Sequence, residues 1–177
     1  MATKVFVGMS GGVDSSLSAA LLKEQGYDVT GIYMKNWTQD LPGMVCPWAD
    51  DLADAKRVAV QLGIPFKVYD FEEDYKQKVV DYMVEEYQAG RTPNPDIMCN
   101  QEVKFKLFLD AALEDGAEMI ATGHYARVDD GGWTIDDRQV PEEKNRAVVQ
   151  HPTSNVQRLL RPKDEVKDQT YFLYRVT

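Results

Sequence analysis

The residues best suited to chemistry lie near the start of the chain, in the run Ser10-Gly11-Gly12-Val13-Asp14-Ser15-Ser16. Serine hydroxyls and backbone N–H groups bind oxyanions, and two adjacent glycines let the backbone approach a ligand closely. The run follows the apolar stretch 4–8 and precedes a helical pattern, so an anion there would meet the positive end of a helix dipole. We therefore predict a phosphate-binding loop between a first strand and a first helix.

Cys99 is the second candidate for chemistry. It follows the proline-rich segment Arg91–Asp96 and stands at or just before the start of a predicted helix. The positive end of a helix dipole lowers the pKa of a thiol and so raises its thiolate fraction. A lone cysteine is, however, more often a small buried apolar residue. From the residues alone, the nucleophile and the packing residue both remain open.

The glycine-rich loop differs from two common nucleotide-binding motifs. No lysine follows Gly12, as a Walker A loop would require, and the spacing Gly-x-Gly-x-x-Gly is absent. An ordinary glycine-rich turn between a strand and a helix is the alternative. Six specified residues in a strand-to-helix context favour the phosphate loop over that alternative.

Apolar periodicity predicts the elements that position these residues. We expect strands at 4–8, 28–35, 65–70 and 118–122, and helices from Val13 and over 49–62, 72–88 and 100–114, with loops at 36–48 and 91–96. This order predicts an α/β fold, a Rossmann-like doubly wound parallel sheet. The inward face of the first helix is expected to carry Val13, Leu17, Ala20, Leu21 and Leu22, and that of the last Val103, Leu107, Phe108, Ala111 and Ala112.

Composition bounds the classes of protein. The chain has 177 residues, 44% of them hydrophobic and 28% charged, which suits one domain with a proper core. No stretch has the apolar length of a membrane span, and the first strand follows the N-terminus too closely for a targeting peptide. The two cysteines form no disulfide framework, so we expect a cytoplasmic protein. A net charge of −9 argues against a broad nucleic-acid surface on this chain alone.

Three regions are expected along the chain. Residues 1–128 are expected to form the domain that carries the phosphate loop, and residues 129–166 are charged, turn-rich and irregular, either disordered or an excursion from the domain. Residues 167–177 are apolar and aromatic again and indicate the start of a further element. We therefore expect the chain to be part of a longer protein.

Several segments together resemble a known family. Ser-Gly-Gly-x-Asp-Ser after a first strand resembles the PP-loop of the ATP pyrophosphatases, which cleave ATP between the α and β phosphates and adenylate an oxygen. Further segments resemble the tRNA-specific 2-thiouridylase family, MnmA/TrmU, over nearly the whole chain except about 129–166. They are Met34-Lys35-Asn36-Trp37, Asp51–Ala55, Asn94–Asn100, Val103-Lys104-Phe105, Thr122–Arg127 and Lys167-Asp168-Gln169.

The resemblance implies a reaction and a set of roles. ATP would adenylate the C2 oxygen of the wobble uridine of certain tRNAs, such as those for Lys, Glu and Gln, and a persulfide sulfur would then displace AMP. The phosphates would lie on Gly8, Met9, Ser10, Gly11, Gly12, Val13, Asp14 and Ser15, with Asp14 also helping to place Mg²⁺ and to catalyse, and Met34 and Gly123 would line the adenosine site. Asn94, Pro95 and Asp96 would meet the flipped-out base, and Lys167, Asp168 and Gln169 would contact tRNA.

The resemblance assigns Cys99 as the first cysteine of the family, a nucleophile or an acid–base partner. The family also uses a second cysteine as persulfide carrier, further along the chain and loaded by a sulfur-donor protein. Cys46 does not match that position, so we interpret it as structural or incidental and expect the carrier cysteine beyond Thr177.

Two alternatives come from other classes. One is another PP-loop ligase that adenylates a small molecule, for which AMP formation would need that molecule and not tRNA. The other is a nucleotide sensor that binds ATP without turnover, although the segment Asn94–Cys99 has no purpose in a pure sensor.

Overall fold

The computed structural model describes residues 2–40, 43, 45–124, 126–129, 158–160 and 168–173. The chain divides into two compact units, one formed by residues 1–124 with 175–177 and the other by residues 125–174. The candidate residues for phosphate binding and for thiol chemistry all belong to the first unit.

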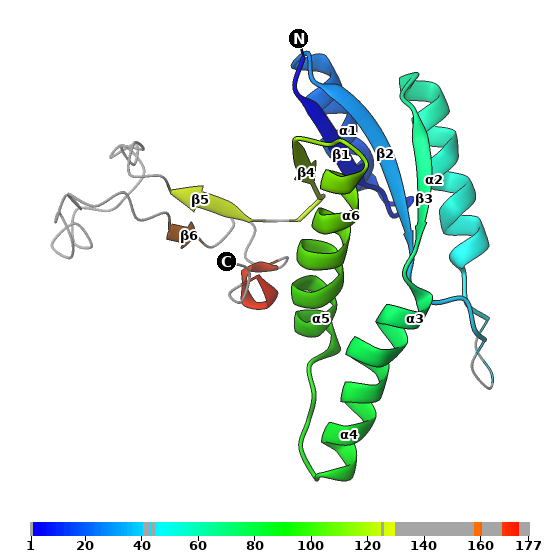
Figure 1. Ribbon diagram of the computed structural model, residues 1–177, viewed down its shortest axis with the longest axis vertical. Coiled ribbons are helices and arrows are strands. Elements are labelled where there is room, and N and C mark those ends of the chain that lie inside the picture. The colour runs from blue at the N-terminus through cyan, green and yellow to red at the C-terminus, as the bar shows by residue number, and fades with distance from the viewer. Residues whose placement is uncertain are drawn as a thin grey trace, which may run out of the picture. The chain divides into compact units, whose positions relative to one another are not determined.

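A four-stranded parallel sheet forms the centre of the first unit (Figure 1). Its strands are β1 (Lys4–Gly8), β2 (Asp28–Lys35), β3 (Phe66–Asp70) and β4 (Met119–Ala121), in the order β3-β2-β1-β4. In the register, Val7 pairs with Gly31 on one side and with Ala121 on the other. The α/β fold with a parallel sheet predicted from the sequence is confirmed.

Each face of the sheet packs against its own core, as a doubly wound fold requires. Successive residues of a strand point to opposite faces, and Phe6 packs into one core while Val5 and Val7 pack into the other. The first core is built with side chains from the helical stretch 72–114, and the second with side chains from the helices that follow β1 and β2. The first core includes Ile32, Val79, Val103, Phe108 and Ala112, and the second includes Ala19, Val29, Tyr33 and Ala55.

Helix α1 (Val13–Glu24) is rotated relative to the expected orientation. Val13, Leu17 and Leu21 are 81%, 54% and 45% exposed, whereas Ser15 and Ala19 are buried. The expected inward face was therefore wrong for three of its five residues. The reason is that the helix follows the glycine loop directly, and Ser15 must face that loop to bond it. The bonding of the loop, rather than the largest apolar side chains, determines the orientation of α1.

Two longer helical stretches contain π-helical turns. The first comprises α3 (Glu72–Tyr75), η1 (Lys76–Asp81) and α4 (Tyr82–Gln88), and the second α5 (Pro95–Met98), η2 (Cys99–Leu107) and α6 (Phe108–Glu114). The two stretches lie side by side (Figure 1), with contacts between α5 and η1 and between η1 and η2. Helix α2 (Trp48–Leu62) begins one residue before the expected range of 49–62, and it buries Ala55 and Ala59.

The second long stretch begins five residues earlier than expected. Asn94 caps it, since its Oδ1 accepts from the N–H of Ile97 at 3.2 Å, and Pro95 occupies the first helical position. Proline suits that position because its missing N–H would have no partner there. The prediction of a loop over 91–96 was therefore wrong at its end, where the prolines mark a helix start rather than a barrier.

The second unit is described only in short pieces. Strand β5 (Arg127–Asp129) pairs antiparallel with β6 (Arg158–Leu160), an element not expected within 129–166. A 3₁₀ turn, η5 (Thr170–Phe172), follows Asp168, whose carboxylate accepts from the N–H of Thr170 at 2.9 Å. The predicted domain limits at 128 and 167 stay predictions. Among the described residues, no helix combines the length and apolar character needed to cross a bilayer.

Candidate functional site

The loop between β1 and α1 is held together by its own serine side chains. The Oγ of Ser15, a buried residue in the first turn of α1, accepts from the N–H of Ser10 at 3.2 Å and lies 3.3 Å from the Ser10 hydroxyl. The Ser15 hydroxyl also donates to the Gly12 carbonyl at 3.2 Å, and the Ser10 Oγ accepts from the N–H of Gly12 at 3.4 Å. These bonds close the loop over the first turn of α1, whose N–H groups have no carbonyl partner within the helix. The arrangement suits an anion.

Two glycines are required by the packing around this loop. Gly11 has φ +80°, and a Cβ there would lie 2.7 Å from the carbonyl oxygen of Asp51 in α2. Gly123, just after β4, lies so close to α1 that a Cβ would be 2.5 Å from the nitrogen of Ser15. The predicted phosphate loop and the predicted adenosine residue Gly123 are therefore brought together at the start of α1.

The remaining predicted nucleotide residues differ in what they can offer. Met34 and Gly8 meet at the carboxyl ends of β2 and β1. A Cβ added to Gly8 would lie 2.9 Å from the Met34 methyl group. The Met9 side chain is 1% exposed and belongs to the core, which leaves only its backbone for a ligand. Val13 is largely exposed beside Gly12. The nucleotide roles of these residues stay predictions.

A pocket of about 300 Å³ lies within the same unit, at the carboxyl end of β2. It brings Cys99 together with Met34, one of the predicted adenosine residues, and with Cys46. Aromatic side chains form much of its wall. The full lining comprises Tyr33, Met34, Asn36, Trp37, Cys46, Pro47, Trp48, Asp51, Tyr75, Cys99 and Lys104.

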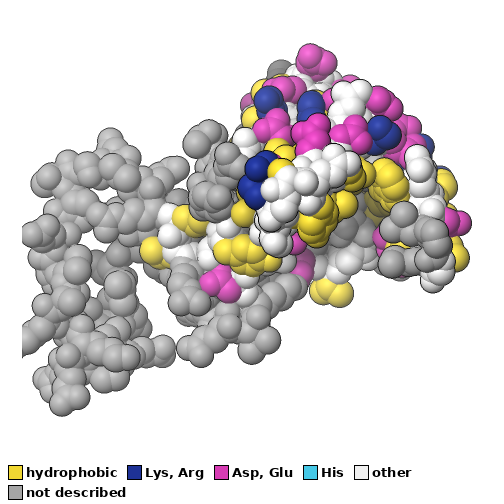
Figure 2. Space-filling view, turned by 90° about the horizontal axis from the view of Figure 1, so that it is seen from below, with side chains coloured by type: hydrophobic (Ala, Val, Ile, Leu, Met, Phe, Trp, Pro, Cys, Tyr) yellow, Lys and Arg dark blue, Asp and Glu magenta, His cyan; other side chains and the backbone are white. Residues whose placement is uncertain are grey.

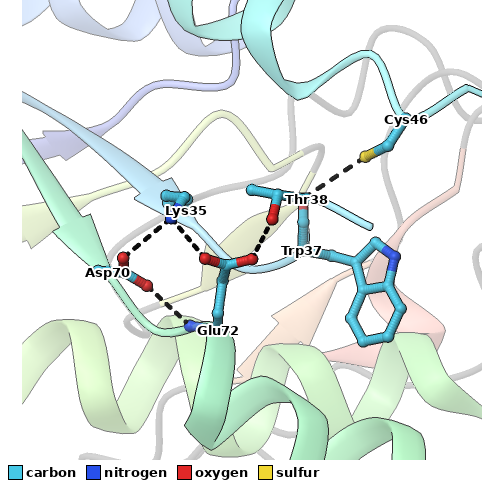
Figure 3. A network of polar contacts seen from close by, with 6 residues as sticks. All are labelled: Lys35, Trp37, Thr38, Cys46, Asp70 and Glu72. Atoms are coloured by element: carbon cyan, nitrogen blue, oxygen red, sulfur yellow. Dashed lines mark hydrogen bonds and ion pairs between the residues drawn. The ribbon is translucent and has the colours of Figure 1, made fainter. Parts of the chain in front are cut away.

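A network of polar contacts ties the loop that walls this pocket to the sheet (Figure 3). The Lys35 ammonium donates to Asp70 at 3.0 Å and to Glu72, and Glu72 also accepts from the Thr38 hydroxyl. The hydrogen bond and charge of Lys35 lower the pKa of both carboxyl groups. Further along the loop, the Cys46 thiol lies 3.5 Å from the Trp37 carbonyl oxygen. The network therefore anchors one end of segment 36–47 beside the pocket.

Cys99 does not have the lowered pKa that its predicted place suggested. It lies one turn inside the helical stretch 95–114, away from the N-terminal N–H groups. Burial raises the pKa of the Cys99 thiol, the charge of Lys104 lowers it in part, and the Asp96 carboxylate raises it further. The expectation of a thiol acidified by a helix dipole was wrong, because the helix begins at Pro95 and burial dominates.

A partly buried chain of hydrogen bonds joins the same helix to the end of β4. The His124 Nε2 lies 2.9 Å from the Asn100 Oδ1, and its Nδ1 lies 2.7 Å from the Thr122 hydroxyl. Burial lowers the pKa of His124 to about 4, so the ring is neutral at neutral pH. Its ring also packs on Phe105, with 5.4 Å between centroids. His124 thus fastens the helix of Cys99 to the end of β4.

The predicted base-contacting residues begin the helix that carries Cys99. The Asn94 Oδ1 is used in the cap, Pro95 is the first helical residue, and the Asp96 carbonyl accepts from the Asn100 amide at 2.9 Å. Asp168 and Gln169, predicted to contact tRNA, lie in the second unit, and Lys167 lies outside the described residues. Within the described part, no group of three or more His, Cys, Asp or Glu side chains is arranged to hold a metal.

Sequence reasoning missed two features of this site. It interpreted Cys46 as structural or incidental and did not place it near Cys99, whereas the structure puts Cys46 and Cys99 in one pocket. It also gave no role to Lys104, although the segment Val103-Lys104-Phe105 stood out. The signal for Lys104 was its spacing, five residues after Cys99. Two side chains five residues apart share one face in a π-helix but not in an α-helix.

Comparison with known proteins gives one family. Residues 3–177 match the family model of the tRNA methyl transferase HUP domain. The tRNA-specific 2-thiouridylase MnmA of Bacillus velezensis is 52% identical over 171 residues, which cover 97% of this chain and 40% of that protein. The MnmA of Bacillus subtilis is 50% identical over 175 residues, covering 99% and 41%. The chain thus spans about two fifths of the length of these curated relatives.

Among solved structures, the U34-tRNA thiolase NcsA of Methanococcus maripaludis with its [4Fe-4S] cluster is similar with a TM-score of 0.50. The two are 25% identical, and the match covers 69% of this chain and 38% of NcsA.

Proposed function

This chain belongs to the MnmA family, and its residues 3–177 match the tRNA methyl transferase HUP domain. We propose that the protein is an ATP-dependent tRNA-uridine 2-sulfurtransferase. Its substrate would be the wobble uridine of tRNA, whose C2 oxygen is replaced by sulfur. The observation that carries the proposal is the pairing of a phosphate loop with a pocket that holds Cys99 and Met34 in one unit. Identity of about 50% to 2-thiouridylases over nearly all of this chain supports it.

The phosphate loop suits the first chemical step. The uracil carbonyl is a poor electrophile, and its oxygen becomes a leaving group once it is joined to the α phosphate of ATP. The O2–Pα bond forms as the bond to the β phosphate breaks and pyrophosphate leaves. The backbone N–H groups of the loop and the hydroxyls of Ser10 and Ser15 would hold the phosphate oxygens against the start of α1.

The pocket suits the second step. The terminal sulfur of a persulfide on a carrier cysteine attacks C2, and AMP leaves with the original oxygen. The Cys99 thiol would then attack the carrier sulfur, which breaks the S–S bond, frees 2-thiouridine and leaves a disulfide for an external thiol to reduce. An open pocket of about 300 Å³ bordered by aromatic side chains has room for a flat base beside Cys99.

The remaining roles follow the same division. Mg²⁺ is a hard cation that takes carboxylate and phosphate oxygens, and Asp14 at the loop would hold it together with the phosphates of ATP. Asn94, Pro95 and Asp96 would meet the base, and Lys167, Asp168 and Gln169 the tRNA. The face shown in Figure 2 mixes acidic and basic side chains, so we propose that much of the tRNA contact comes from outside this chain. The proposal also includes a partner protein that donates the persulfide sulfur and a location in the cytoplasm.

The test uses the longest gene product that contains these residues, with Mg²⁺ and ATP labelled at the α phosphate. AMP should appear only with an unmodified tRNA that carries uridine at the wobble position, and should disappear when that uridine is replaced by cytidine. AMP that forms without tRNA, in response to a small molecule, would indicate another PP-loop ligase. ATP binding without AMP under either condition would indicate a sensor.

Cys99→Ser separates the two steps. It should keep tRNA-dependent AMP formation, at least in a single turnover, while 2-thiouridine is lost. Cys46→Ser is the matched control in the same pocket, and it should keep both products. Loss of thiolation in Cys46→Ser alone would contradict the assignment of Cys99.

A further inference from the structure

Lys104 is the one Lys or Arg among the described residues that line the Cys99 pocket. The other charged residue of the lining is the acidic Asp51, and the chain as a whole carries a net charge of −9. A single cation in a partly desolvated pocket exerts a stronger local field than a cation in open solvent. The position of Lys104 therefore affects the charge inside the pocket more than the overall charge of the surface.

The π-helical turn is what brings Lys104 to the side of Cys99. Helix η2 spans Cys99–Leu107, and its i→i+5 bonding is seen in the N–H of Phe108, which donates to the Val103 carbonyl. In such a helix, residues five apart lie about one turn apart on one face. In an α-helix the same two residues would differ by about 140° around the axis. Winding η2 as an α-helix would therefore carry Lys104 away from the pocket.

The next pair on the helix follows the same rule. Asn100 and Phe105 are also five residues apart, and both contact His124, one by a hydrogen bond and the other by its ring. The contacts of His124 therefore hold η2 in the register that places Cys99 and Lys104 together. π-Helical turns occur often at functional sites.

Lys104 is also distinguished from its neighbours by its partners. Lys106, two residues on, pairs with Glu102 at 3.2 Å, and Lys78 pairs with Asp74 at 3.0 Å. Within the described residues, no carboxylate lies within ion-pair distance of the Lys104 ammonium, and the residue as a whole is partly exposed. The cation is thus available to a negative charge that develops inside the pocket.

We propose that Lys104 is a positioning residue for the Cys99 sulfur, whose thiolate it stabilises and holds toward the pocket during sulfur transfer. The inference rests on the proposed function only in giving that sulfur a reaction to perform. The groups facing Cys99 agree with it. Asp96 from α5 disfavours the thiolate, Tyr75 from α3 is neutral, and Lys104 is the group that favours it. Tyr33, Cys46 and Asp51 complete the titratable lining of the pocket.

The test measures the reactivity of Cys99 in the longest gene product that contains these residues, without tRNA or ATP. Alkylation by iodoacetamide is followed from about pH 6 to 10, with the Cys99 peptide resolved from the Cys46 peptide by mass spectrometry. Lys104→Met keeps the apolar stem and removes the charge, so alkylation of Cys99 at about pH 8 should slow about three- to tenfold, as its profile moves to higher pH. Lys104→Arg should restore most of the rate, because it keeps the charge.

Lys106→Met is the matched control on the same helix, and it should leave the Cys99 profile unchanged. A thermal midpoint of Lys104→Met within a few degrees of the parent excludes a general loosening, which would speed alkylation rather than slow it. Equal profiles for the parent and Lys104→Met would overturn the inference, whatever the tRNA assay shows. A shifted profile in a protein that fails to thiolate tRNA would leave the Lys104–Cys99 coupling intact and refute the proposed function instead.

Discussion

Gly123 offers the sharpest test of how the nucleotide site is built. A Cβ at this position would lie 2.5 Å from the Ser15 nitrogen and 2.7 Å from the Asp14 carbonyl carbon. Both neighbours are backbone atoms, so no side chain can rotate aside. Gly123→Ala must therefore push the start of α1 away from the end of β4, and the phosphate loop must move with it.

The size of the effect follows from the overlap. The closest contact is about 1 Å shorter than ordinary van der Waals separation, and overpacking of this kind costs about 1–3 kcal/mol. For a chain of this length, about 2 kcal/mol lowers the thermal midpoint by about 4–8 °C. A shift of about 1 Å also misaligns the Ser10–Ser15 bonds, so we expect ATP affinity to fall at least about tenfold, or about 1.4 kcal/mol.

The assay compares ATP affinity by calorimetry with the thermal midpoint in the same preparations. Val79→Ala is the matched control, because Val79 is 1% exposed and lies in the core on the opposite face of the sheet from α1. It should lower stability by a similar amount and leave ATP affinity within about twofold. If Gly123→Ala binds ATP as tightly as Val79→Ala does, the reasoning is refuted. The substitution would then have lowered the stability of the chain without displacing the loop.

Two further predictions concern the frame around the pocket. Because burial lowers the pKa of His124 from its ordinary value of 6.5 to about 4 in the folded chain, the unfolded chain binds more protons between these values. Stability should thus fall as pH drops from about 6.5 to 4, and His124→Gln should flatten that part of a plot of thermal midpoint against pH; an unchanged slope would contradict a buried neutral ring. Phe108 is 0% exposed in the core beside η2, so Phe108→Ala should cost about 3–5 kcal/mol in urea unfolding, and Phe108→Leu clearly less, whereas equal losses would argue against close packing there.

The sheet was predictable because its signals are local and repeated. Each strand is a short apolar run bounded by turn residues, and the observed bounds differ from the expected ones by at most one residue at either end. The inward face of the helix through Phe108 followed from periodicity as well, since packing against the sheet decides it. The serine- and glycine-rich loop between the first strand and the first helix was predictable because its residue types are specific in order, and its binding of phosphate stays a prediction.

The errors arose where one element constrains another. The orientation of α1 is decided by the bonds of Ser15 to Ser10 and Gly12, which no hydrophobic pattern records. The helix start at Pro95 depends on the cap from Asn94, and two prolines in the segment concealed it. The thiol of Cys99 then proved to be governed by burial rather than by a helix dipole. Each of these facts depends on contacts that only the folded chain contains.

The proposed function requires one small unit to serve two chemical steps. Met34, at the end of β2, lies against Gly8, the last residue of β1 before the predicted phosphate loop, and also lines the pocket of Cys99. Gly123, two residues after β4, braces the start of α1, while the adjacent His124 holds the helix of Cys99 in its π-helical register. The carboxyl ends of β2 and β4 therefore each touch both sites. A nucleotide bound at the loop would contact the same backbone that aligns the thiol, so the two steps of the proposed reaction would share one geometry.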